Sequence, residues 1–365
     1  MTVGCPRRGT RSLAVWTGVL AALVAGCARS PRPLHPRALA LQAAGVEALG
    51  RGELDRAAGH FSLALEYEPR IAEAENGLGL VALRRGDWPR AEERFHAALA
   101  LDEDLAEAHL NLATVLIHRD EPAAALAEAR AALAIDPGYA DARLLTAEML
   151  LRLGQLDDAR WELEKLCAAA PERADAHAAN ALVLARQGRI AAAENEARRA
   201  LELDGQLPSA HRARAEILRR AGDLEGASRE LEIVIAANSG AIDDRLAHAT
   251  VAAARGLWSQ ADGELTALRA AAPMRAEICF AQAFVALARE QLTAALEAAD
   301  AALALRPRYP EARLVRAEAL ARLGRDAEMR RELARFLDQA PPAMAAERAQ
   351  AQRALRARKP LVGIQ

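Results

Sequence analysis

Histidine and cysteine side chains are the residues of this chain best suited to metal binding or nucleophilic chemistry. His177 and His211 lie 34 residues apart, while Cys167 and Cys279 are much farther from each other. A zinc site needs three or four ligands, and the spacing alone supplies no evident third ligand beside the two histidines. The sequence contains no glycine-rich phosphate loop, HExxH, GxSxG or paired CxxC motif. We therefore expect no enzymatic activity, no cofactor, no metal site and two free cysteines inside the fold.

A different cysteine, Cys27, follows the one long apolar run near the start of the chain. This run, residues 13–26, comes after an amino-terminal region that has three arginines and no acid. It is shorter than the ~20 apolar residues that span a bilayer. A positive head, a short apolar middle and small residues before a break are typical of a secretory signal peptide, so we interpret residues 1–26 as that signal.

The sequence LVAGC, which ends at Cys27, resembles the lipobox of bacterial lipoproteins. The resemblance implies that the Cys27 thiol receives a diacylglycerol, that the lipid anchors the chain through acyl groups such as palmitate, and that cleavage makes Cys27 the first residue. The alternative is an ordinary signal peptide with an incidental cysteine. Residues 27–37 carry three prolines and favour an extended tether. Ala28 stands where inner-membrane lipoproteins of this type prefer Asp, which favours the outer membrane, facing the periplasm.

From residue 38 the chain is rich in Ala, Leu, Glu and Arg, which favours helix throughout. When the chain from Ala38 is divided into successive units of 34 residues and the units are aligned, small residues recur at the same positions. The eighth position is Gly or Ala in all nine units, the twentieth is Ala in all but one, and the fifteenth is Gly in all except the units with Asp120 and Glu290. Small residues let two helices approach closely, and Gly can end a helix in the left-handed conformation. Each unit is therefore predicted to be a helical hairpin.

This pattern is similar to the tetratricopeptide repeat over residues 38–343. The resemblance implies an all-α, right-handed superhelical solenoid of nine 34-residue helix-turn-helix repeats, stabilised by the stacking of neighbours. Residues 344–365 are predicted to form a capping helix and a tail. One position departs from the family: most units have His, Arg or Glu at the fourth position, as at His177 and Arg313, where the family usually has a bulky apolar residue. This departure leaves open how tightly the first helix packs.

Charge is unevenly distributed along the chain. Residues 38–170 hold 24 acidic and 13 basic residues, whereas residues 312–359 hold 6 acidic and 12 basic residues. Such a polar array can orient a protein partner. The acidic front and the predicted export disfavour nucleic acid as a partner.

In tetratricopeptide proteins, positions 2, 5, 9 and 12 of each first helix line the concave surface, so the resemblance implies a groove for a protein partner. These positions are apolar with a few amides in the first three units, polar in the middle units and aromatic in the eighth. The predicted groove residues are Gln42, Val46, Leu49, Asn76, Leu80, Leu83, Leu110, Thr114, Ile117, Phe280, Phe284 and Leu287. Exposed apolar side chains in a groove indicate an interaction surface. The alternative is that the superhelix or the capping helix covers them.

These features predict a lipid-anchored periplasmic scaffold that binds protein partners and supports assembly of a cell-envelope machine. Tetratricopeptide lipoproteins that serve type IV pili, gliding, secretion or polysaccharide export are similar in architecture. The alternative is an accessory regulator of a peptidoglycan enzyme or of another envelope enzyme.

Overall fold

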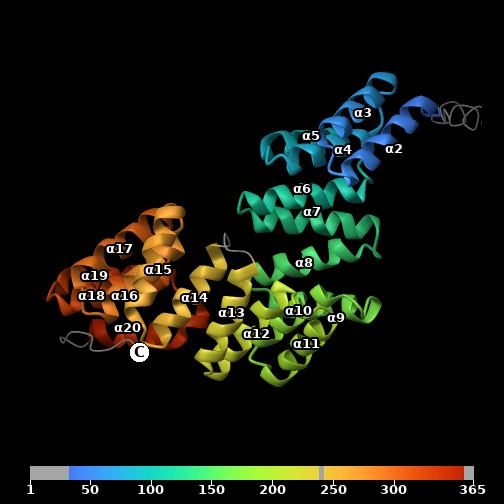
Figure 1. Cartoon of the computed structure of the whole chain (residues 1–365). Coiled ribbons are helices and arrows are strands. Elements are labelled where there is room, and N and C mark those ends of the chain that lie inside the picture. The colour runs from blue at the N-terminus through green and yellow to red at the C-terminus, as the bar shows by residue number, and fades with distance from the viewer. Residues whose placement is uncertain (1–32, 238–241, 357–365) are drawn as a thin grey trace, which may run out of the picture. The chain divides into compact units, whose positions relative to one another are not determined.

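A computed structural model describes residues 33–237 and 242–356 of the chain (Figure 1). The predicted signal peptide and Cys27 lie outside the described residues. The described chain forms nineteen α-helices, α2 to α20, and one short 3-10 helix, without a strand. This confirms the prediction of an all-α repeat fold. The contacts divide the chain into two compact units, Met1–Pro137 and Gly138–Gln365, which are described separately below.

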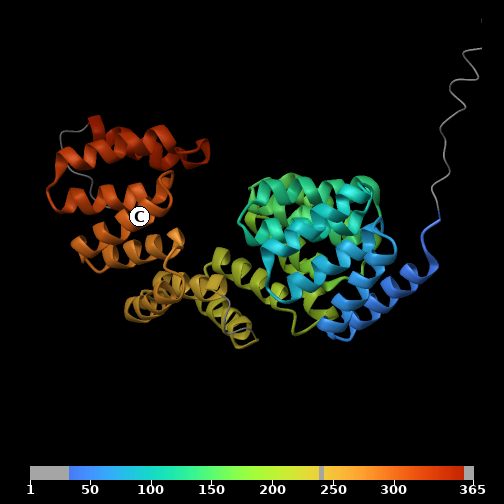
Figure 2. The same ribbon diagram turned by 90° about the horizontal axis from the view of Figure 1, so that it is seen from above.

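The first unit contains three helical hairpins, in which consecutive helices pack side by side (Figure 2). Its helices are α2 (Pro36–Gly50), α3 (Leu54–Tyr67), α4 (Ala72–Arg84), α5 (Trp88–Leu101), α6 (Ala106–His118) and α7 (Pro122–Ile135). Helix α2 begins inside the predicted tether, because Pro36 suits the first helical turn and His35 Nδ1 accepts a hydrogen bond from the Arg37 N–H at 3.2 Å.

The second unit contains six hairpins and a final helix. Its helices are α8 (Ala140–Arg152), α9 (Leu156–Ala169), α10 (Ala174–Arg186), α11 (Ile190–Leu203), α12 (Pro208–Ala221), α13 (Leu224–Ala237), α14 (Ile242–Ala254), α15 (Trp258–Ala271), α16 (Ala276–Ala288), α17 (Leu292–Leu305), α18 (Pro310–Arg322), α19 (Asp326–Gln339) and α20 (Ala345–Arg356); the 3-10 helix spans Pro342–Met344. In both units, every even-numbered helix from α2 to α18 is the first helix of a hairpin and covers positions 1–13 of the 34-residue unit; α2 begins two residues earlier and α12 ends one residue later.

The predicted left-handed residue ends the first helix of every hairpin. All seven glycines at the fifteenth position have φ between +72° and +87°. The two exceptions keep the same conformation, with φ of 60° at Asp120 and 59° at Glu290. The turn geometry is therefore retained even where the side chain disfavours it, since a left-handed conformation is costly for most residues other than glycine.

Small residues at the eighth position allow the two helices of a hairpin to pack closely. A Cβ atom added to Gly79 would lie 2.4 Å from the Phe95 ring, and one added to Gly45 would lie 2.6 Å from the Phe61 ring. Both phenylalanines are fully buried. Glycine in the first helix is thus matched to a large ring in the second.

Helix α20 closes the carboxyl-terminal end of the second unit, as predicted for a capping helix. Ala351 and Ala354 pack in one buried cluster with Leu333 and Phe336 of α19. Arg348 Nη1 donates hydrogen bonds to the backbone carbonyl oxygens of α19 and of the turn after it, at 2.9 and 2.6 Å. These bonds satisfy carbonyl groups that a helix end leaves without partners inside the helix.

Candidate functional site

The predicted groove residues lie on first helices, and the structure places them in two separate groups. Nine of them lie on α2, α4 and α6 of the first unit, and three lie on α16 of the second unit. Most of these side chains are half-buried. Val46 is 52% exposed and Phe284 is 48% exposed, while Asn76 is only 9% exposed. We call the surface formed by successive first helices within one unit the first-helix face.

Two polar groups on the first-helix face of the first unit form hydrogen bonds within the protein. Asn111 Nδ2 donates to Asn76 Oδ1 at 2.9 Å, which links α6 to α4. The Thr114 hydroxyl donates to the backbone carbonyl of Leu110 at 3.1 Å. Because a buried amide needs a partner, the two asparagines stabilise the stacking of neighbouring hairpins.

The first-helix face of the second unit contains an apolar hollow of about 540 Å³. We call it the α14–α16 hollow. Its lining residues are Leu246, Ala249, Thr250, Ala253 and Ala254 of α14, Trp258 and Leu265 of α15, and Glu277, Phe280, Ala281, Phe284 and Val285 of α16. The structure therefore brings Phe280 and Phe284 together in one site.

Sequence reasoning missed the α14 side of this hollow, although the signal was present. Leu246, Thr250 and Ala253 occupy positions 5, 9 and 12 of the seventh unit, the same positions that identified Phe280 and Phe284 in the eighth. The small alanine side chains leave space opposite the large rings. Small residues facing large ones across two helices thus create a recess.

The two phenylalanines differ in their surroundings. The Phe280 ring packs against the Tyr309 ring at 5.1 Å between centroids, and Phe280 is half-buried. Phe284 is the exposed member of the pair. An apolar ring that is half open to solvent costs little to remove from the fold and gains hydrophobic free energy when a partner covers it.

One carboxylate, Glu277, lies at the edge of the α14–α16 hollow. Burial opposes its ionisation, but hydrogen bonds from its own backbone and from Arg306, together with the charge of Arg306, hold the pKa of Glu277 below its usual value. Burial raises the pKa of the Tyr309 hydroxyl to about 12. The hollow therefore presents an apolar lining with one ionised acid at its edge, which suits an apolar segment better than a charged small molecule.

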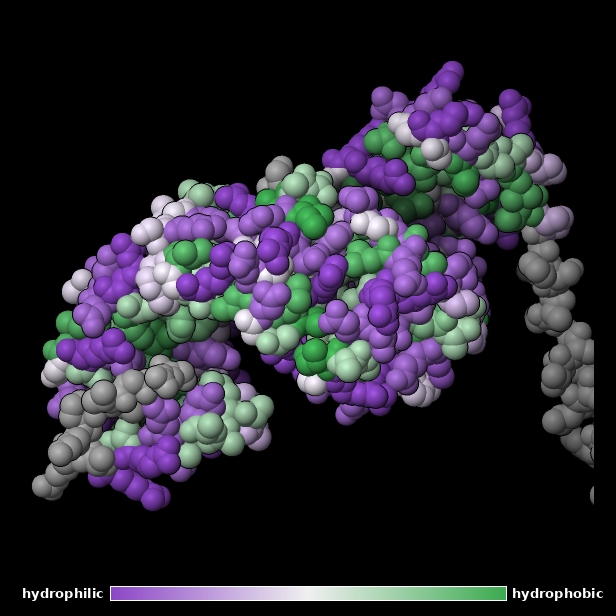
Figure 3. Space-filling view, turned by 60° about the horizontal axis from the view of Figure 1, so that its bottom comes forward, coloured by the Kyte–Doolittle hydropathy of each residue, from purple (hydrophilic) through white to green (hydrophobic). Residues whose placement is uncertain are grey.

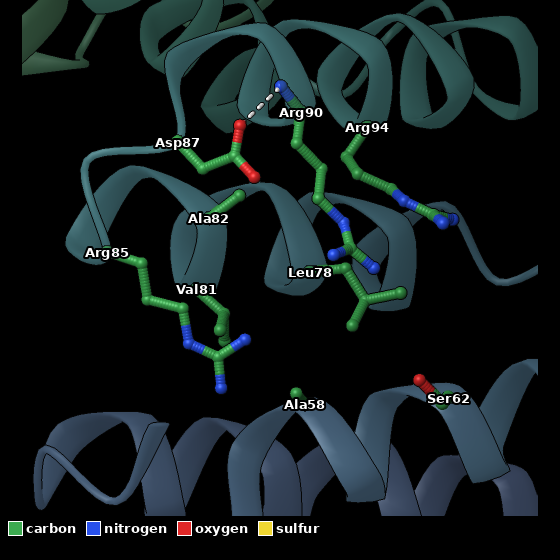
Figure 4. Close-up of a pocket in the computed structure, with 9 residues that line it drawn as sticks. All are labelled: Ala58, Ser62, Leu78, Val81, Ala82, Arg85, Asp87, Arg90 and Arg94. Atoms are coloured by element: carbon green, nitrogen blue, oxygen red, sulfur yellow. Dashed lines mark hydrogen bonds between the residues drawn. The ribbon is translucent and has the colours of Figure 1, made fainter. Parts of the chain in front are cut away.

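A second pocket, in the first unit, has a different character (Figure 4). It has a volume of about 90 Å³ and lies between α3, α4 and α5. Arg85 and Arg90 point into the space above Ala58 of α3. Arg94 also lines it and pairs with Glu75 at 2.8 Å. This pocket is small and positively lined, so it offers no apolar surface comparable with the α14–α16 hollow.

Polar residues at the fourth position form hydrogen-bonded pairs with a glutamate between the two helices of a hairpin. His109 Nδ1 lies 2.7 Å from Glu128, His211 Nδ1 lies 2.7 Å from Glu230, and Arg313 lies 2.9 Å from Glu332. The second nitrogen of each fourth-position group faces a backbone carbonyl oxygen six residues earlier, at distances of 2.8–3.3 Å. Polar pairs thus replace the apolar contact that the family usually has at this position.

At His177 the same arrangement gains a thiol. His177 Nδ1 lies 2.6 Å from Glu196, and Cys167 of the preceding hairpin joins them as a third potential metal ligand. Burial, followed by the charges of Glu196 and Asp175, raises the pKa of the Cys167 thiol to about 12. Within the described ranges, Cys167 and Cys279 are free cysteines, as expected; Cys167 is half-buried and Cys279 is buried.

The surface seen in Figure 3 is mostly hydrophilic, with separate hydrophobic areas. Among the described helices, none combines the length and the hydropathy that crossing a bilayer requires.

Two tetratricopeptide repeat models match most of the chain. One matches residues 43–92, 78–140, 178–241 and 280–344, and the other matches residues 116–183. No curated protein sequence matches the chain. Solved structures do resemble it, and a tetratricopeptide repeat protein from Parabacteroides merdae is 16% identical, with a TM-score of 0.54 over 68% of this chain and 99% of that one.

Two further solved structures are similar in part. A chain of the APC/C hetero-tetramer Cut9–Hcn1 is 13% identical, with a TM-score of 0.59 over 77% of this chain and 55% of that one. PilF of Pseudomonas aeruginosa is 24% identical, with a TM-score of 0.43 over 58% of this chain and 97% of that one. At these identities the likeness concerns the fold alone. With the matched repeats and the observed hairpins, the chain belongs to the tetratricopeptide repeat family.

Proposed function

We propose that this protein is a scaffold that binds an apolar segment of a protein partner in the α14–α16 hollow. Tetratricopeptide repeat proteins bind peptide or protein partners. The observation that carries the proposal is the exposed Phe284 ring beside the recess of about 540 Å³. Aromatic side chains next to a pocket are favoured centres of binding free energy.

The partner segment is expected to be apolar. The lining offers aromatic and aliphatic side chains, and its one carboxylate, Glu277, is already paired with Arg306 and Arg275. An amphipathic helix, or an extended segment with two or three large apolar residues, meets this requirement.

Photo-crosslinking from the hollow tests this function. A photoreactive phenylalanine analogue at Phe284 should capture one or a few protein partners in cells, because the ring lies where the partner would bind. The same analogue at Leu323, an exposed leucine outside the hollow, is the matched control. Equal capture from both positions, or none from Phe284, would contradict the proposal.

We further propose that the scaffold is anchored by a lipid on Cys27 to the outer membrane, facing the periplasm, and supports assembly of a cell-envelope machine. The support comes from the sequence: an arginine-containing head, a short apolar run and the LVAGC motif. A single lipid signal binds membranes weakly, so two or more acyl chains are expected on this cysteine.

Metabolic labelling with a fatty-acid probe tests the anchor. The wild-type chain should take up label and lose residues 1–26, whereas Cys27→Ser should remain an unlabelled precursor, because the thiol is the acceptor. Cys5→Ser is the matched control and should label normally. Label on the Cys27→Ser variant would overturn this part of the proposal.

A further inference from the structure

We propose that Cys167, His177 and Glu196 form a metal site for a divalent transition ion, with zinc as the fitting ion, and that this ion joins two consecutive hairpins. The Cys167 sulfur, a ring nitrogen of His177 and a carboxylate oxygen of Glu196 all lie within 4.8 Å of one another. Cys167 belongs to α9, whereas His177 and Glu196 belong to α10 and α11 of the next hairpin.

The three ligand types suit zinc. Zinc binds cysteine sulfur at about 2.3 Å and histidine nitrogen or carboxylate oxygen at about 2.0–2.2 Å, usually with four ligands. Ligands around such an ion lie within about 4 Å of each other, so small side-chain rotations bring these three groups into range. Water would supply the fourth ligand, because Cys167 and Glu196 are half-buried and not sealed from solvent.

The histidine is already oriented for this role. His177 Nε2 lies 3.2 Å from the backbone carbonyl oxygen of Pro171, while Nδ1 faces Glu196 at 2.6 Å. Metal-binding histidines usually donate their other ring N–H to a carbonyl or carboxylate, which fixes the ring and its tautomer. The Pro171 carbonyl therefore directs Nδ1 toward the ion.

The charges around the thiol also favour a cation. After burial, the charges of Glu196, Asp175 and Glu164, in that order, disfavour a negative charge on Cys167. Asp175 is itself paired with Arg173 at 2.6 Å. A divalent ion would neutralise these negative charges and stabilise the thiolate.

Other hairpins of the same chain have the same histidine–glutamate pair and differ from this site in the residue at the position of Cys167. His109–Glu128 and His211–Glu230 have the same pair geometry, but the residues that correspond to Cys167 are Leu99 and Leu201. The cysteine replaces a leucine beside an existing histidine–glutamate pair. The chain therefore supplies its own comparison sites, which lack only the sulfur ligand.

Binding of zinc and of cobalt(II), which reports thiolate ligation by a near-ultraviolet absorption band, tests the proposal on the full chain. The wild type should bind one ion with this band and should melt at a higher temperature with zinc than without it. Cys167→Leu, which introduces the residue of the comparison sites, should lose the band and the thermal shift. Cys279→Ser should keep both.

A second variant, His177→Arg, tests the site independently in case Cys167→Leu does not fold. Arg143 and Arg313 make the same pair with a glutamate as His177 does, so His177→Arg preserves the pairing while it removes the nitrogen ligand. Its zinc affinity should fall by at least the 10–100-fold that losing a supporting residue of a metal site costs. The circular-dichroism spectra of both variants without metal should match the wild type. A cobalt–thiolate band in Cys167→Leu, or no metal binding by the wild type, would overturn the proposal.

Discussion

The two units build the same hairpin with different side chains. In two hairpins of the first unit, the first helix crosses the second where a glycine meets a phenylalanine ring, as at Gly79 and Phe95. In the second unit, alanine at the eighth position packs with leucine in several hairpins, as at Ala249 and Leu265, which share one buried cluster. At the two glycine crossings, the large phenylalanine ring compensates for the side chain that glycine lacks.

The first-helix faces differ in a second way. Amide hydrogen bonds link neighbouring helices in the first unit, whereas aromatic rings face alanines in the α14–α16 hollow. Both surfaces arise from the same repeat positions. The positions that build the hairpin are therefore nearly constant, and the positions between them vary, so the two first-helix faces differ.

Removing a buried charge in the second unit should have the largest effect on stability. Glu332 is 2% exposed at its side chain and pairs with Arg313 at 2.9 Å, Arg316 at 3.1 Å and Arg335 at 2.7 Å. Glu332→Ala leaves Arg313 buried without its carboxylate, and we expect a loss of about 3–5 kcal/mol in the free energy of unfolding.

The corresponding change in the first unit is the control. Glu75 pairs with Arg94, whose side chain is 30% exposed, so Glu75→Ala should cost only about 1 kcal/mol. Urea unfolding followed by circular dichroism measures both losses. Equal losses would show that the two pairs are equivalent and would remove this difference between the units.

Changing the volume at a helix crossing should have an intermediate effect. Gly79→Ala places a Cβ atom 2.4 Å from the Phe95 ring, and we expect a loss of about 1–3 kcal/mol from overpacking. Adding Phe95→Leu should restore most of this loss, because the double variant has the alanine–leucine pair of the second unit. Thermal melts of the single and double variants measure the coupling; additive losses would contradict the compensation.

Replacing a non-glycine residue of left-handed conformation by glycine should have the smallest effect on the free energy of unfolding, and this effect should be stabilising. Glu290 has φ of 59°, so Glu290→Gly should raise the free energy of unfolding by about 1 kcal/mol. Asp120→Gly should gain less, because aspartate tolerates this conformation better than glutamate does. Parallel urea titrations compare the two, and a destabilised Glu290→Gly variant would refute the interpretation.

Much of the fold could be predicted from the sequence, because the repeat is periodic. The 34-residue spacing gave the hairpins, the left-handed turns and the face on which Phe280 and Phe284 lie. Spacing does not show which side chains meet across helices, so the pairing of His211 with Glu230 and the α14 side of the hollow became visible only in the structure. Cys167 and His177 belong to different hairpins, and the stacking of those hairpins brings them together.

The affinity of the crosslinked partner for the Phe284→Ala variant tests most directly whether the α14–α16 hollow binds that partner. Phe284 is 48% exposed, so its removal should leave the melting temperature nearly unchanged, as should the control Leu323→Ala, which lies outside the hollow. We expect Phe284→Ala to weaken binding by ~2 kcal/mol, about 30-fold, and Leu323→Ala to leave binding unchanged. Undiminished affinity in Phe284→Ala with an unchanged melt would contradict the claim that the α14–α16 hollow is the binding site.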